Sequence, residues 1–203
     1  MKQRELEMLL QRIPPHPHPR ADLEQYPTPA PIAADLVYQA LAAGDIQGKR
    51  VLDLGCGTGV LAMAAALAGA EEVVGVDIDV KSLQIAEEAA RSLGLPPDLP
   101  GWRIGKVDEA RIKADTVLMN PPFGAQKRHA DQPFHVTALA CAPVVYTLVN
   151  GETADWTERF YVGCGARVTA RWTYRFVLPA QFWWHDKPRE HIEVAALRAV
   201  RAG

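Results

Sequence analysis

An apolar strand that leads into a glycine-rich turn and then into a helix is the feature that most restricts how this chain can fold. The segment lies at residues 51–67 and reads VLDLGCGTGVLAMAAAL. Glycines lack a Cβ, so such a turn lets the backbone approach a nucleotide-like ligand closely. Its spacing is G-x-G-x-G, whereas a dinucleotide site prefers G-x-G-x-x-G, and Val60 takes the last position here. The turn therefore predicts a nucleotide-like ligand and disfavours a nicotinamide cofactor.

Strands and helices continue to alternate on both sides of this turn. Apolar runs predict strands at residues 50–54, 72–76, 102–105, 116–119 and 143–148. Helical spacing predicts helices at residues 32–43, 60–67, 80–93, 133–141 and 153–162. Strands that alternate with helices form a mostly parallel sheet covered on both faces. The sequence therefore predicts an α/β, Rossmann-like fold with a doubly wound sheet.

The C-terminal part of the chain has a different pattern, which predicts an antiparallel hairpin at the end of the sheet. Residues 167–178 alternate strictly between apolar and polar side chains, and the apolar run 192–200 would pair with them through a loop at 179–191. The face predicted to be apolar carries Val168, Ala170, Trp172, Tyr174 and Phe176. The opposite face would carry Arg167, Thr169, Arg171, Thr173 and Arg175. These arginines either follow the phosphates of a ligand or form a solvated outer face, and the sequence leaves both open.

The N-terminal part is predicted to be a short helix followed by an irregular segment. Residues 4–13 have amphipathic helical spacing, while residues 14–31 contain seven prolines, which exclude regular structure. A chain of 203 residues with 48% hydrophobic content can form one sizeable core, and no internal repeat or domain boundary is evident. We therefore predict a single domain over 1–203, with the helix and Pro-rich segment at 1–31 and the catalytic core at 32–203.

Composition excludes several classes of protein. No apolar run approaches the roughly 20 residues that span a bilayer, and the charged N-terminus is unlike a signal peptide, so we expect a soluble, cytoplasmic protein without membrane contact. Cys56, Cys141 and Cys164 have neither C-x-x-C spacing nor a nearby histidine at ligand spacing, which predicts no disulfide framework and no metal. The net charge of −2 lacks the positive field of a free-standing nucleic-acid binder.

Acidic residues follow the predicted strands where a nucleotide-like ligand could use them. Asp77 ends the strand after the glycine turn, 22 positions beyond Gly55, where a carboxylate can accept hydrogen bonds from both ribose hydroxyls. Asp79 is better explained as the N-cap of the next helix. Asp108 follows the third strand, and could either reach the adenine amino group of a cofactor or serve only as a turn residue.

The tetrapeptide Asn120-Pro121-Pro122-Phe123 follows the strand at 116–119, at the end of the sheet where ligands bind in open α/β folds. Prolines donate no hydrogen bond, so their carbonyls stay available as acceptors beside the Asn120 side-chain oxygen. Adenine N6 is a poor nucleophile, and acceptors at Asn120 and Pro121 could bind its two N–H groups and direct its lone pair at a methyl donor. Phe123 would stack on a base that is unpaired or flipped out. A plain tight turn is the alternative.

Together these motifs resemble the class I S-adenosylmethionine-dependent methyltransferases. The D-x-G-x-G-x-G pattern at residues 53–59 is similar to their first motif, and Asp77 to the acidic end of their second. The resemblance implies that the methionine part of S-adenosyl-L-methionine lies over the glycine turn and that Asp53 meets its amino group. The cofactor-binding residues expected in this region are Asp53, Gly55, Gly57, Thr58, Gly59, Val60, Asp77 and Asp108.

A closer resemblance covers almost the whole chain. The chain is similar to the small archaeal and eukaryotic methyltransferases that make N6-methyladenosine in small-subunit ribosomal RNA. The matching runs are residues 23–28, 53–61, 76–79, 119–124, 178–180 and 192–194. By this resemblance Gln25 and Thr28 line the cofactor site, and the Pro-rich segment is a lid over it. The eukaryotic members depend on a small zinc-binding activator protein, so a similar partner is implied.

The substrate side is less well defined by the sequence. Lys127, Arg128 and His129 follow the tetrapeptide and serve either as RNA contacts or as a solvated loop. Trp183 and Trp184 depart from the family's pattern, which has fewer aromatic residues there. Two other functions stay open: N5 methylation of a glutamine amide in a release factor, for which the family's motif has tyrosine at the last position of the tetrapeptide, and a non-catalytic cofactor-binding RNA scaffold.

Overall fold

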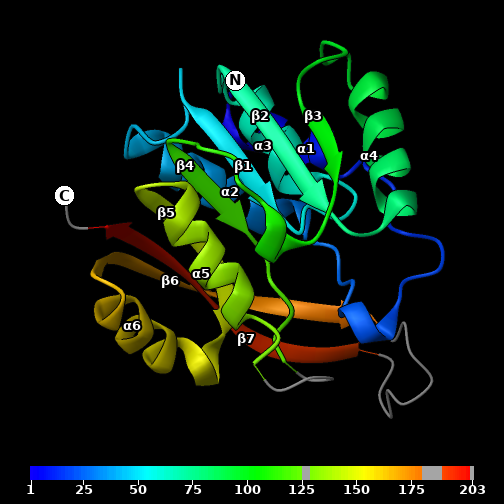
Figure 1. Cartoon of the computed structure of the whole chain (residues 1–203). Coiled ribbons are helices and arrows are strands. Elements are labelled where there is room, and N and C mark those ends of the chain that lie inside the picture. Colours follow the sequence, from blue (N-terminus) through cyan, green and yellow to red (C-terminus); the bar gives the residue numbers. More distant parts are fainter. Residues whose placement is uncertain (125–128, 180–188, 202–203) are drawn as a thin grey trace.

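One seven-stranded sheet organises the computed structural model, which describes residues 1–124, 129–179 and 189–201, with the side chains of 177–179 and 189–191 excepted. The strand order is β3-β2-β1-β4-β5-β7-β6 (Figure 1). The strands are β1 (Arg50–Leu54), β2 (Glu72–Asp77), β3 (Gly101–Ile104), β4 (Thr116–Met119), β5 (Val144–Asn150), β6 (Ala166–Pro179) and β7 (Arg189–Arg201). The first five strands pair in parallel, and β7 is antiparallel to both β5 and β6. The predicted doubly wound sheet with an antiparallel hairpin at its end is confirmed.

Helices cover both faces of the sheet. They are α1 (Gln3–Leu10), α2 (Ala30–Ala42), α3 (Val60–Leu67), α4 (Val80–Ser92), α5 (Gln132–Cys141) and α6 (Ala154–Gly163), with short 3₁₀ turns η1 (Ala21–Leu23), η2 (Val107–Glu109) and η3 (Gly151–Thr153). Figure 1 shows α5 and α6 in front of the sheet and α1, α2 and α3 behind it. The predicted helices and strands are confirmed with small shifts at their ends, whereas the 3₁₀ turns were not predicted. Among the described helices, none is long and apolar enough to cross a membrane.

The centre of the sheet explains where a ligand can bind. Strand β1 is buried on both faces, because Val51 packs into the core on the α1–α3 side and Leu52 and Leu54 pack into the core beneath α5. Such strands read as nearly continuous apolar runs, as residues 51–54 do. The chain runs outward from β1 to β2 and β3 on one side, and from β4 to β5 on the other. The order therefore reverses between β1 and β4, which is where open α/β sheets bind ligands.

A β-bulge in β6 corrects one prediction. Val168 pairs with Ala199, but Ala170 pairs with Arg198, so Thr169 is an extra residue on this strand. Val168 packs on the core side of α5 and α6, whereas the aromatic residues beyond the bulge pack on the opposite face. The prediction that Val168 shares their face was therefore wrong, because strict alternation was interrupted by one unpaired residue. The residues beyond the bulge are Trp172, Tyr174 and Phe176.

The same bulge divides the predicted arginine face. Arg167 pairs with Val200 and Arg171 with Leu197, and side chains three residues apart on one strand point to opposite faces. Arg171 and Arg175 thus lie opposite Arg167. Arg171 is also occupied, because its guanidinium contacts acidic side chains of α6 at 2.6 and 3.4 Å, those of Asp155 and Glu158. The three arginines therefore do not lie on one face of the strand, as strict alternation had predicted, and they do not form a single row that could follow phosphates.

Polar contacts hold Thr169, the extra residue of the bulge. Its hydroxyl accepts a hydrogen bond from the Arg198 guanidinium at 2.7 Å. The same guanidinium donates to Asp45 at 2.8 Å, and the buried Tyr146 hydroxyl donates to Asp45 at 2.6 Å. A buried carboxylate is stable only when it is paired and hydrogen-bonded. This network joins the loop before β1 to β5, β6 and β7.

Candidate active site

A cavity of about 470 Å³ lies at the carboxyl ends of β1, β2 and β4, whose arrowheads point to one edge of the sheet (Figure 1). The glycine-rich turn forms its floor, and Asp77 and Asn120 line it from the ends of β2 and β4. The N-terminal residues 22–28 also line it, as the predicted lid would require. Thr58 within the turn and Val60 directly after it are buried, and Asp108 is exposed at the rim on η2. The volume is in the range of small-molecule and cofactor sites.

The three glycines of the turn have different neighbours. A Cβ on Gly57 would meet nothing within 4 Å, so this residue faces open space in the cavity. A Cβ on Gly55 would lie 2.7 Å from the Phe134 ring, and one on Gly59 would lie 2.5 Å from the Trp102 ring. All three have positive φ, at 70°, 53° and 82° in chain order. The turn is therefore shaped both by the ligand cavity and by two aromatic side chains that pack against it.

Asp53 is a buried carboxylate with an unused acceptor. Its side chain is 1% exposed, and its Oδ2 accepts a hydrogen bond from the Ala62 amide at 2.8 Å. Its Oδ1 has no hydrogen-bond partner in the described part of the chain. Burial raises the pKa of Asp53 to about 7. Buried polar atoms are nearly always hydrogen-bonded, so a ligand is expected to supply the donor for Oδ1. A positively charged donor would bind this carboxylate most strongly.

Asp77 closes β2 and is held by the backbone around it. Its two oxygens accept from the Gly57 and Asp79 amides at 2.8 and 2.9 Å, and burial raises its pKa. The carboxylate is thereby fixed at the edge of the cavity. Asp79 caps α4 by accepting from the Lys81 amide at 3.1 Å, which confirms its predicted role.

Polar contacts with Asp79 hold the Pro-rich segment at the carboxyl end of β2. The Gln25 carboxamide donates to Asp79 at 2.9 Å and accepts from the Arg20 amide at 2.7 Å. The His16 Nε2 lies 3.3 Å from the same Asp79 carboxylate. Gln25 therefore lines the cavity with a side chain whose amide group is already engaged within the protein.

The side-chain carboxamide of Asn120 has a bonded nitrogen and an oxygen without a partner among the described residues. Its Nδ2 donates to the Thr28 hydroxyl at 3.0 Å, a contact between residues 92 positions apart in the chain. Its Oδ1 is buried and accepts no hydrogen bond from any residue the structure describes. Thr28 is 9% exposed, so the pair lies within the wall of the cavity. The site therefore offers a fixed acceptor to a ligand N–H group.

The rest of the tetrapeptide is divided between the cavity and the core. Pro122 lines the cavity, and Pro121 is buried. Phe123 is half-buried against the core, with its ring edge-on to Phe176 at 6.3 Å between centroids and 79° between planes. Neither Phe123 nor Pro121 is among the described residues that line the cavity.

Two of the three predicted RNA contacts, Lys127 and Arg128, lie outside the described residues. His129 is exposed at the rim of the cavity in the left-handed region, with φ of 62°. Its ring lies 6.1 Å from that of Trp156, at the start of α6. In the described ranges, no group of three His, Cys, Asp or Glu side chains is placed to hold a metal ion.

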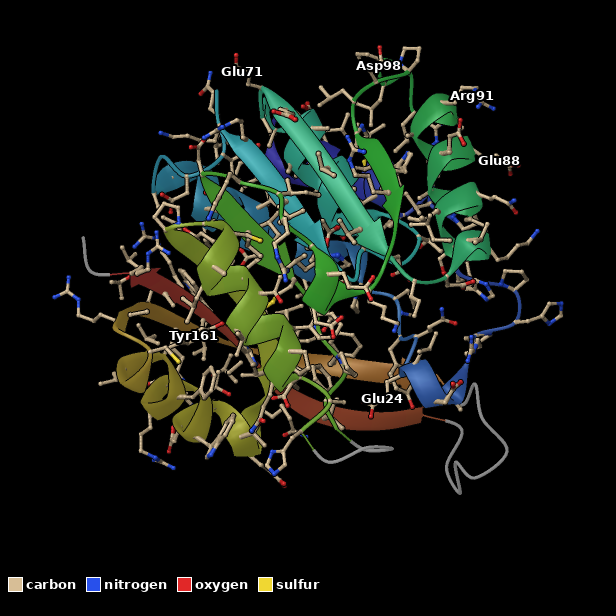
Figure 2. The ribbon with its side chains drawn as sticks, viewed as in Figure 1. Glu24, Glu71, Glu88, Arg91, Asp98 and Tyr161 are labelled. Atoms are coloured by element: carbon tan, nitrogen blue, oxygen red, sulfur yellow. The ribbon has the colours of Figure 1, made fainter. Side chains whose placement is uncertain are left out.

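Sequence reasoning missed the part of the cavity that α5 supplies. Phe134 lines the cavity and packs on the glycine turn, yet no motif marks it. A buried pair fixes this helix: Tyr161 reaches from α6 toward α5 (Figure 2), where its hydroxyl lies 2.9 Å from His135 Nδ1. Burial raises the pKa of Tyr161, so its hydroxyl stays protonated. This contact joins α5 to α6 at the residue that directly follows Phe134.

Comparison with known proteins identifies the family of the chain. The family model "Methyltransferase small domain" matches residues 31–142. The rRNA N(6)-adenosine-methyltransferase METTL5 of Danio rerio is 36% identical, with 98% of each chain covered, and the Drosophila melanogaster protein of that name is 33% identical, with 96% and 94% covered. The crystal structure of PH1948 from Pyrococcus horikoshii has a TM-score of 0.93 at 36% identity, over 100% of this chain and 99% of that one. The chain is a methyltransferase of the methyltransferase small domain family.

Proposed function

We propose that this enzyme transfers a methyl group from S-adenosyl-L-methionine to adenine N6 in RNA, and that the RNA is small-subunit ribosomal RNA. The observation that carries the proposal is the buried Asn120 Oδ1, an acceptor without a partner in the described chain at the end of β4. An amino group with two N–H donors is the substrate group that such an acceptor suits. The METTL5 relatives, named as rRNA N(6)-adenosine-methyltransferases, support adenine as the base.

The residues around the cavity fit the cofactor. S-adenosyl-L-methionine carries the methyl group on a sulfonium, which makes that methyl electrophilic. Its ammonium group would pair with the unused Asp53 Oδ1, and its ribose would lie at Asp77. Gly57 faces open space, which leaves room for the methionine part. Asp108 at the rim would accept from the amino group of the cofactor's own adenine, and Thr58 and Val60 would contact the cofactor from the turn and from the start of α3.

Positioning is the main catalytic contribution of the protein. Asn120 Oδ1 and the Pro121 carbonyl would each accept one N–H of the substrate amine, so that its lone pair faces the methyl group. The nitrogen would then form the new N–C bond as the bond from the methyl carbon to sulfur breaks; the electron pair of that bond would stay on sulfur, and one N–H proton would leave to solvent. Both acceptors favour the positive charge that develops on nitrogen. No strong general base is needed for this step.

Recognition of the RNA belongs to the rim of the cavity. Phe123 would stack on the flipped base, and Lys127, Arg128 and His129 would contact the strand beside it. The net charge of −2 gives little general attraction to RNA, so the ribosomal context or a small zinc-binding activator protein would supply further affinity. Such an enzyme would act in the cytoplasm.

The direct test is incubation with radiolabelled S-adenosyl-L-methionine and purified ribosomal RNA, with and without a zinc-binding activator, followed by nucleoside analysis. The expected product is N6-methyladenosine in the small-subunit RNA. A release factor serves as the competing acceptor, because a glutamine amide presents the same two N–H donors. Label in the protein and none in RNA would establish amide methylation instead, and absence of transfer to either would favour a non-catalytic scaffold.

Cofactor affinity is expected to depend on pH through Asp53. Burial raises the pKa of Asp53 to about 7, so the carboxyl is mostly protonated below that pH in the cofactor-free protein. A bound ammonium stabilises the carboxylate, so binding at low pH must release a proton. The association constant should therefore rise by up to about tenfold per pH unit below pH 7, and level off above it. Calorimetric titration between pH 5.5 and 8 at constant ionic strength measures this.

The Asp53→Asn variant is the control for this pH dependence. It keeps an acceptor for the Ala62 amide but cannot ionise. Its cofactor affinity should be lower at pH 8 and nearly constant across the range. A wild-type affinity that does not change between pH 5.5 and 8 would contradict the role of Asp53.

A further inference from the structure

We propose that Thr28 is a positioning residue for methyl transfer, which holds the Asn120 carboxamide with its oxygen toward the substrate amine. This inference rests on the proposed function, because it assigns the orientation of the acceptor that carries that function. The contact behind it is the hydrogen bond from Asn120 Nδ2 to the Thr28 hydroxyl at 3.0 Å. Thr28 thereby acts on the reaction through Asn120, in addition to lining the cofactor cavity.

The carboxamide of an asparagine needs such a contact. Its terminal torsion is broad and roughly two-fold, so the oxygen and the nitrogen can exchange places. With Nδ2 on Thr28, the free end is Oδ1, which is buried and without a partner in the described chain. With the group reversed, the hydroxyl could still donate to the oxygen, but the free end would then present N–H groups to the N–H groups of the substrate. The hydroxyl thus fixes the plane of the carboxamide, and only the arrangement with Nδ2 on Thr28 presents an acceptor to the amine.

The backbone around Thr28 is suited to hold a side chain in place. Pro27 and Pro29 flank it, and each ring fixes φ and restricts the residue before it. Helix α2 begins at Ala30, and its N-terminal end anchors this stretch to the core. The Thr28 side chain is 9% exposed, so solvent has little access to the hydroxyl. A buried hydroxyl on rigid backbone restricts the Asn120 torsion more than a surface contact would.

The Pro-rich segment thus contacts both halves of the site. At one end, Gln25 donates to Asp79, directly after the strand that carries Asp77. At the other end, Thr28 accepts from Asn120, after β4. The segment therefore spans from the cofactor side of the cavity to the acceptor that faces the substrate. Its role extends beyond that of a cover.

Replacement of Thr28 by valine tests this inference, since valine keeps the shape and removes the hydroxyl. Turnover at saturating RNA and cofactor should fall roughly ten- to a hundredfold, because a misplaced acceptor loses orientation of the amine. The cofactor Kd should stay within about threefold of wild type, because the variant does not change Asp53 and Asp77, which are proposed to bind the cofactor. Thr28→Ser retains the hydroxyl and should restore turnover to within about threefold. Thr28→Ala is the second hydroxyl-free variant, and should behave as Thr28→Val does.

Different outcomes separate this inference from the proposed function. Wild-type turnover in any folded hydroxyl-free variant, with thermal unfolding as the test of folding, would overturn the positioning role. A loss of cofactor affinity that matches the loss of turnover would also overturn it, by making Thr28 a cofactor contact only. Full methyl transfer by Asn120→Ala in the same assay would instead refute the proposed function. In an Asn120→Ala background, Thr28→Val should cause no further loss of residual turnover, because the group that it positions is gone.

Discussion

Replacement of Asn120 by alanine is expected to lower methyl transfer by a factor on the order of a thousand, with cofactor affinity within about threefold of wild type. The variant removes the buried Oδ1, the fixed acceptor that orients the substrate amine. It leaves in place Asp53 and Asp77, the carboxylates proposed to bind the cofactor, because backbone amides hold them on other strands. Turnover with ribosomal RNA and calorimetric titration of the cofactor, measured on the same preparation, separate the two effects.

The chain offers a matched control for this variant. Its only other asparagine is Asn150, whose side chain accepts from the Glu152 amide at 3.0 Å and caps the 3₁₀ turn η3. Asn150→Ala should lower stability by about 1 kcal/mol and leave turnover unchanged. If Asn120→Ala kept more than a tenth of wild-type turnover, or if both variants lost activity equally, the catalytic role of Asn120 would be refuted.

The sequence predicted those parts of the site that depend on strand ends. Periodicity located β1, β2 and β4 closely, and their parallel order brings Asp53, Asp77 and Asn120 to one edge of the sheet. Each of these residues lies within or next to a strand, so local pattern and topology were enough to place it. The same reasoning correctly predicted that Asp79 is the N-cap of α4.

Contacts between distant segments could not be predicted in this way. The bulge at Thr169 depends on a guanidinium on β7 and a carboxylate before β1, neither of which affects the alternation of residues 167–178. Phe134 lies against Gly55, 79 positions earlier in the chain, and Thr28 contacts Asn120 across 92 positions of sequence. The family resemblance pointed to Thr28 as a cavity residue, but only the structure gives its partner.

Gly59 of the glycine turn also has a contact with a distant segment that the sequence did not predict, and its replacement should have a large effect on stability. Gly59 was predicted to serve the cofactor, yet it is not among the described residues that line the cavity, and its missing side chain leaves space for Trp102 of the edge strand β3. A Cβ there would lie 2.5 Å from Trp102 Cη2. The ring also lies close against Gly75, since a Cβ there would be 2.7 Å from Trp102 Cε3 and Cζ3. Gly59→Ala is therefore expected to destabilise the protein by about 3 to 4 kcal/mol, from left-handed strain and overpacking together.

Comparison with Gly44→Ala separates these two contributions. Gly44 has φ of 77°, close to the 82° of Gly59, but a Cβ on it would meet nothing within 4 Å. This control should lose only the roughly 1 to 2 kcal/mol of left-handed strain. Urea unfolding of both variants gives the difference, which measures the clash with Trp102. Combining Gly59→Ala with Trp102→Leu should recover part of that difference. Equal losses of unfolding free energy in Gly59→Ala and Gly44→Ala would contradict the clash. They would mean that the ring moves aside at no cost and that backbone conformation alone requires the glycine.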